Sequence, residues 1–92
     1  GTITSKDGRE LYVTTGRGNS VVVIDTARNV VVATIPVGQR VWGLAVSPDD
    51  QKLYTANGAS NDVSVIDVRA RKELKRIKVG DGPWGVAVGP KW

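Results

Sequence analysis

Apolar residues in this chain come in short runs, and each run is separated from the next by polar or Gly-containing stretches. Arg71–Val79 alternates charged and apolar residues, which is typical of a strand with one face in water. Gly43–Ser47 is apolar almost throughout, as in a strand buried on both faces. The pattern therefore predicts four short strands in each half of the chain. They are Gly1–Ser5, Glu10–Thr15, Ser20–Asp25 and Val31–Val37, then Gly43–Ser47, Lys52–Ala56, Asp62–Asp67 and Arg71–Val79.

The chain repeats itself with a period of 42 residues. Positions 1–50 align with positions 43–92 without a gap, and 19 of the 50 pairs are identical. The identical pairs fall on apolar and turn positions, where a repeating fold needs them. The 92 residues therefore form a single segment. We divide it into a first repeat (1–42), a second repeat (43–84) and the start of a third (85–92).

Four antiparallel strands in about 40 residues is the period of a β-propeller blade. Helical repeats of similar length need apolar residues at helical spacing, and this sequence has almost none. The predicted fold class is all-β, with two four-stranded antiparallel propeller blades per chain and one extra inner strand.

Composition narrows the function. The chain contains no His, no Cys and no Met. Transition-metal sites and nucleophile–base pairs thus lack their usual residues, so we predict no catalytic, cofactor-binding or metal-binding residues and no enzyme. No stretch resembles a membrane span or a signal peptide. Because the chain begins at Gly1 and lacks Met, it is expected to be a trimmed, excised or engineered product.

The two halves carry a resemblance to a known family. The stretches GRELYVTTGRGNSVVVIDTA and QKLYTANGASNDVSVIDV, each followed by a V-G pair and a W-G-x-A-V motif, are similar to the YVTN family of β-propeller repeats. The tetrapeptide that names the family stands here, imperfectly, as Tyr12-Val13-Thr14-Thr15 and Tyr54-Thr55-Ala56-Asn57. The resemblance implies a periplasmic or extracellular protein that serves as a binding scaffold or as a partner of redox systems. This chain departs from the family in having two blades only.

The extra strand suggests how two blades are completed. Because a blade packs against neighbours on both faces, two isolated blades leave two apolar faces uncovered, which is costly for a small domain. We expect copies to close into a ring, a trimer with six blades or a tetramer with eight. A neighbour would then receive the assembly strand, which consists of Gly85, Val86, Ala87 and Val88. The alternative is that the chain is the C-terminal remnant of a longer propeller.

Three residues are candidate ligand contacts at the mouth of the central channel. Trp42 and Trp84 occupy the same place in the two repeats, just before the innermost strand, and Arg40 has Gly82 as its counterpart. An aromatic ring at the mouth would hold a flat or apolar ligand. The alternative is that both Trp side chains pack between adjacent blades.

Repeated Asp residues are candidates for a carboxylate ring that holds a cation. Asp25 and Asp67 each end a predicted third strand, and Asp7 and Asp49 lie in matching turns. Asp also bonds the N–H groups of turns, so a repeated Asp in a repeated turn needs no ligand. We therefore expect turn residues. The loops Arg17-Gly18-Asn19 and Asn57–Asn61 are further binding candidates by position alone.

Basic residues cluster in the last predicted strand of the second repeat. A run of this kind either binds an acidic polymer or protects an outer strand from edge-to-edge pairing. Because the first repeat lacks the run and no aromatic side chain lies in it, we favour protection and expect no nucleic-acid partner. The residues are Arg69, Arg71, Lys72, Lys75, Arg76 and Lys78.

The sequence thus predicts a non-catalytic β-propeller scaffold or binding module that assembles with itself and binds a protein or small-molecule ligand. The alternative, which rests on the family resemblance, is an accessory or part of a periplasmic quinone-dependent oxidoreductase system. No membrane partner is expected.

Overall fold

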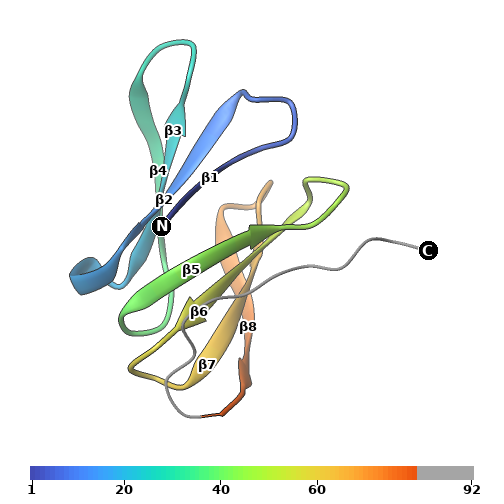
Figure 1. Ribbon diagram of the computed structural model, residues 1–92. Coiled ribbons are helices and arrows are strands. Elements are labelled where there is room, and N and C mark those ends of the chain that lie inside the picture. The colour runs from blue at the N-terminus through green and yellow to red at the C-terminus, as the bar shows by residue number, and fades with distance from the viewer. Residues whose placement is uncertain (81–92) are drawn as a thin grey trace.

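The computed structural model describes residues 1–80, which form two four-stranded antiparallel sheets (Figure 1). In each sheet the strands lie side by side in chain order, so every connection is a hairpin. The first sheet contains β1 (Thr2–Thr4), β2 (Glu10–Thr15), β3 (Ser20–Asp25) and β4 (Val30–Pro36), with a short 3-10 turn, η1 (Gly16–Gly18), between β2 and β3. The second contains β5 (Val41–Val46), β6 (Lys52–Asn57), β7 (Asp62–Asp67) and β8 (Lys72–Lys78). All eight predicted strands are confirmed. The predicted assembly strand, Gly85 to Val88, lies outside the described residues.

Matching turns end the strands in both sheets, as the repeated Asp residues predicted. Ser5 Oγ donates to Asp7 Oδ1 at 2.7 Å, and Ser47 Oγ donates to Asp49 Oδ1 at 2.6 Å. At the other turns, the backbone N–H of Ala27 donates to Asp25 and that of Ala70 donates to Asp67. These carboxylates satisfy turn N–H groups, which confirms the turn interpretation.

Irregular pairing distinguishes the start of β5. Val41 pairs with Asn57 and Gly43 pairs with Ala56, which leaves Trp42 as an extra residue in the strand. A bulge of this kind re-aims a side chain and increases the local twist. The sequence prediction began this strand at Gly43, after Trp42. It missed that the strand begins at Val41 and contains Trp42, because a bulge breaks the alternation by which strands are found.

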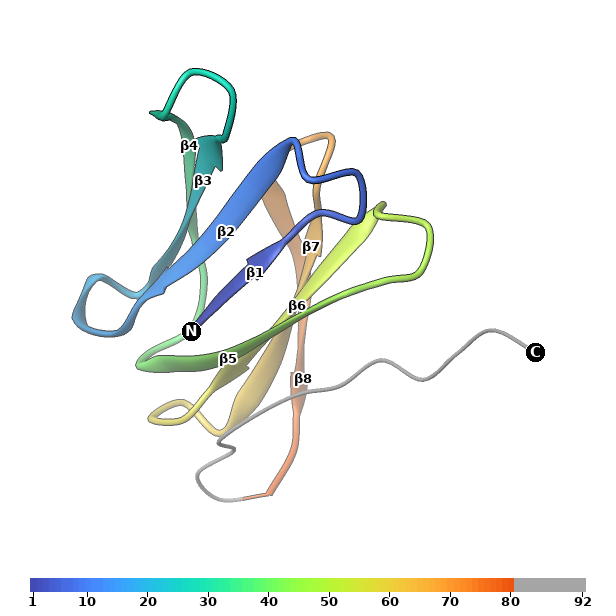
Figure 2. The same cartoon turned by 45° about the horizontal axis from the view of Figure 1, so that its top comes forward.

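The core lies between the two sheets, which pack face to face (Figure 2). The first sheet supplies Tyr12, Val21, Val23 and Ile35, all at most 1% exposed, and the second supplies Leu53 and Ile66, both fully buried. Val37 and Val41, in and after the connection between the sheets, complete the core.

Each sheet therefore uses one face for this contact, and its other face lies outside the core between the sheets, although Ala56 and Val65 on that face of the second sheet are buried (0% and 4% exposed). Antiparallel partners point to the same face of a sheet, so the register assigns the faces. The outer face of the first sheet carries Leu11, Val13, Val22, Ile24 and Val31. The outer face of the second carries Tyr54, Ala56, Val63, Val65, Lys75 and Ile77. Val31 is 60% exposed and Ile77 is 46% exposed.

Candidate functional site

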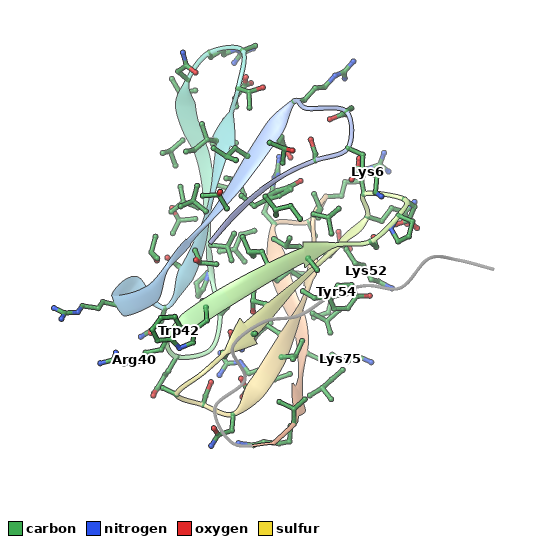
Figure 3. The ribbon with its side chains drawn as sticks, viewed as in Figure 1. Lys6, Arg40, Trp42, Lys52, Tyr54 and Lys75 are labelled. Atoms are coloured by element: carbon green, nitrogen blue, oxygen red, sulfur yellow. The ribbon has the colours of Figure 1, made fainter. Side chains whose placement is uncertain are left out.

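Two of the three predicted channel-mouth residues lie together at one end of the boundary between the sheets. Arg40 and Trp42 are neighbours at the start of β5 (Figure 3). Together with Arg17 of η1, they line a cavity of about 320 Å³ whose other walls are Gly1, Thr14 and Val41. We call this cavity the indole cleft. The third predicted residue, Trp84, lies outside the described residues.

Trp42 is held at the surface by a glycine. A Cβ atom added at Gly58 would come within 2.3 Å of Cδ1 and Nε1 of the Trp42 indole, so the ring fits against this backbone only because position 58 has no side chain. Trp42 is 45% exposed and lies outside the core between the sheets. It therefore presents an apolar surface to solvent.

Arg40 lies in a tight connection between β4 and β5 that also requires glycine. The φ angle of Arg40 is 52°, and its N–H donates to Asn19 Oδ1 at 3.1 Å. The connection crosses closely over the second sheet, since a Cβ atom at Gly38 would lie 2.4 Å from Asn57 Nδ2. The backbone fixes the position of Arg40 while its side chain stays exposed.

The two arginines of the cleft are not neutralised by ion pairs. Among residues 1–80, neither guanidinium is ion-paired with a carboxylate. Asp62, at the start of β7, is 4% exposed and accepts hydrogen bonds from Asn57 and Ser60. Arg17 and Arg40 also line a second, adjoining cavity of about 250 Å³.

At the opposite end of the boundary, an ion pair joins the two sheets. Arg71 Nη1 donates to Glu10 Oε1 at 2.9 Å, Arg71 Nη2 donates to Glu10 Oε2, and the Tyr12 hydroxyl donates to Glu10 Oε1 at 3.2 Å. The hydrogen bonds from Arg71 hold the pKa of Glu10 below its usual range, although partial burial opposes this shift. Burial, reinforced by the Glu10 carboxylate, raises the pKa of Tyr12 to about 12.

Charges of both signs surround this ion pair. Two cavities of about 500 and 620 Å³ are both lined by Glu10, Asp50 and Val68. Both Asp50 carboxylate oxygens accept from the backbone N–H of Lys6, which is a further link between the sheets. In the described part of the chain, no group of three or more acidic side chains is arranged to hold a metal ion.

Three of the six residues of the basic run have partners among the described residues. Arg71 is paired with Glu10, Arg76 with Glu73, and Lys78 Nζ donates to the backbone carbonyl of Ser60. Lys72, Lys75, Arg76 and Lys78 of the run lie on β8, the edge strand of the second sheet, where charge opposes edge-to-edge pairing. Arg69 and Arg71 lie in the turn before it. Within residues 1–80, no helix is long and apolar enough to cross a membrane.

The sequence analysis did not predict that Arg17 lies beside Arg40 and Trp42. It also did not predict the ion pair between Glu10 and Arg71. A signal was present at positions where the repeats differ in charge. Arg17 corresponds to Ala59, and Glu10 corresponds to Lys52. Such differences mark contacts that are made at one blade boundary and not at the next.

Comparison with known proteins defines the class of fold. No family model matches the chain, and no curated protein matches it. Solved structures do match. Over 97% of this chain, the structure of Kuenenia stuttgartiensis hydrazine synthase superposes with a TM-score of 0.95 at 36% sequence identity. The beta-propeller domain of Myceliophteria thermophila Cps50 (Swd1) matches 95% of it with a TM-score of 0.85 at 17% identity. Citrobacter koseri AztD matches 98% with a TM-score of 0.82 at 19% identity.

The two sheets are therefore two consecutive blades of a β-propeller, as predicted. The chain spans about a quarter of each of these structures, 25%, 28% and 26% in the order given. The structural similarity shows the fold.

Proposed function

We propose that this chain is a non-catalytic propeller scaffold of the YVTN type whose copies pack head to tail into a closed ring. One observation carries the proposal. The two outer faces are the repeat equivalents of the two faces that already pack against each other inside the chain.

The correspondence follows from the period of 42 residues. In the core, the Tyr12, Val21 and Val23 face meets the Leu53 and Ile66 face. Their counterparts on the outer surfaces are Tyr54, Val63 and Val65 on the second blade, and Leu11 and Ile24 on the first. The outer face of the first blade in one copy can therefore pack against the outer face of the second blade in another copy, as the two inner faces pack within one chain.

Head-to-tail contacts of this kind close into a ring when the rotation per subunit divides a full turn. Two blades per chain give six blades in a trimer and eight in a tetramer, and both totals lie in the usual range for propellers. The absence of His and Cys supports a scaffold rather than a catalyst. The resemblance to the YVTN family supports a location in the periplasm or outside the cell.

Native mass spectrometry of the chain tests the assembly. We expect a trimer or a tetramer, and we expect Val22→Glu to reduce it to monomers because the new charge lies in the apolar outer face of the first blade. Ala27→Glu, in the exposed turn between β3 and β4, is the matched control and should leave the mass unchanged. A folded monomer of the unaltered chain would contradict the proposal.

A second candidate function is that of a segment or accessory of a quinone-dependent oxidoreductase system. The 36% identity with a stretch of hydrazine synthase favours a place in a larger enzyme. In that case the other blades of that enzyme complete the propeller. The isolated chain would then remain monomeric and would gain stability only when the rest of a propeller is added.

A further inference from the structure

The indole cleft combines positive charge with an apolar wall. Arg17 and Arg40 come from two different connections, η1 and the link between β4 and β5, yet both line the same cavity. Like charges repel, and neither guanidinium has a carboxylate partner among residues 1–80. An anion placed between them would be stabilised by both, and guanidinium groups suit carboxylates because they donate two parallel hydrogen bonds.

Trp42 supplies the other half of a binding site. Its indole is 45% exposed, and the bulge in β5 and the bare backbone of Gly58 position it beside the cleft. An indole ring favours contact with another flat aromatic ring. The cavity, about 320 Å³, is at the small end of the range for small-molecule sites.

We propose that the indole cleft binds a small aromatic carboxylate. Its carboxylate lies between Arg17 and Arg40, and its ring lies against Trp42. The site is formed between the two blades of one chain, so it does not depend on ring closure.

Differences between the two repeats predict how many ligands bind per chain. At the corresponding positions of the second repeat, Ala59 replaces Arg17 and Gly82 replaces Arg40, although Trp84 matches Trp42. A boundary between two copies therefore lacks both guanidinium groups. A ring should bind one ligand per chain, at every second blade boundary.

Isothermal titration of the full chain with 2-naphthoate tests the proposal. We expect one molecule bound per chain. The neutral analogue 2-naphthalenemethanol should bind at least about tenfold more weakly, since it lacks the charged group that accepts from both arginines. Acetate, which lacks the ring, should also bind at least about tenfold more weakly.

Variants locate the site. The double variant Arg17→Gln, Arg40→Gln should weaken naphthoate binding at least about tenfold, and Trp42→Ala should weaken it by a similar factor. Arg69→Gln removes an exposed arginine from the opposite end and should change the affinity less than about twofold. A thermal melt of each variant verifies that it is folded.

Three results would overturn the proposal. They are no binding of naphthoate, equal binding of the neutral analogue, and undiminished binding by a folded double variant. Native mass spectrometry of the same samples reports the oligomeric state separately. A monomeric chain that still binds naphthoate would therefore contradict the proposed ring assembly but not the proposed binding site in the indole cleft.

Discussion

The two blades differ most on faces that the repeat makes equivalent. On the second blade, the face that packs against the first carries a chain of hydrogen-bonded polar side chains. On the first blade, the equivalent face has Val13, Val22 and Val31 where the second has Thr55, Ser64 and Glu73, and the described residues leave it uncovered. The uncovered face is thus the more apolar of the two.

The polar chain of the second blade is buried and fully satisfied. Thr55 Oγ1 donates to Asn57 Oδ1 at 2.9 Å, while Asn57 Nδ2 donates to Asp62 Oδ1 at 2.7 Å and to Ser64 Oγ at 2.8 Å. Ser64 Oγ donates to Glu73, which is paired with Arg76. Among the described residues, no buried side-chain polar atom lacks a partner.

The polar chain fixes the side chains of the second blade, since all of its hydrogen bonds join residues of β6, β7 and β8. The equivalent face of the first blade offers apolar area without such a network. An apolar face without such a network accepts any partner of matching shape. This is the surface expected of a blade that is covered by another blade.

Breaking the polar network should have the largest effect. Asn57→Ala removes the residue that links Thr55, Asp62 and Ser64, and we expect it to lower the free energy of unfolding by about 3 kcal/mol. The equivalent change in the first blade, Thr15→Ala, loses a hydroxyl bonded to Ser20 and should cost about 1 kcal/mol. Urea denaturation measures both values. Equal losses of unfolding free energy for the two variants would mean that the polar network does not distinguish the second blade from the first.

The ion pair at the boundary should contribute less. Glu10→Gln is expected to lower the free energy of unfolding by about 1–2 kcal/mol, because the pair with Arg71 is only partly buried. Lys52→Gln, at the equivalent position of the second blade, should change it by less than about 0.5 kcal/mol.

Glu10→Gln should also change how the free energy of unfolding depends on pH. The folded-state pKa of Glu10 lies below its ordinary value of 4.5, so the carboxylate stabilises the fold above that pH and this stabilisation is lost as the pH falls through the lowered value. Unfolding free energies measured between neutral and acidic pH should converge for Glu10→Gln and the unaltered chain. A gap that stays constant down to low pH would mean that charge is not the cause.

A smaller effect than that of Glu10→Gln is expected at neutral pH from Tyr12→Phe, which removes one hydrogen bond to Glu10 and should cost about 1 kcal/mol or less. Its signature appears at alkaline pH. The pKa of Tyr12 is raised from 10.0 to about 12, so the stabilisation is complete below pH 10 and is lost as the pH rises towards 12. Tyr12→Phe should therefore lose less stability than the unaltered chain over this range. Tyr54→Phe, the equivalent change on the outer face of the second blade, is the control.

Much of the fold was predictable because it depends on local patterns of apolar and turn residues in the sequence. Alternation located the strand Arg71–Val79, short apolar runs located strands such as Ser20–Asp25, and repeated Asp residues located the turns. The start of β5 was not predictable, since the bulge at Trp42 removes the alternation there. For the candidate site, the sequence identified Arg40 and Trp42 from their place in the repeat. It gave no reason to bring Arg17 to them, because that contact is between separate loops.

The strands, the turns and the period can be predicted from the sequence, because each depends on residues close together in the chain. Which differing residues of the two repeats meet follows from the tertiary structure alone. Arg71 reaches Glu10 across 61 positions, and Arg17 joins Arg40 and Trp42 across the blade boundary. Such contacts depend on how one twisted sheet lies on the next, and this arrangement is set by packing of both faces together rather than by any one segment.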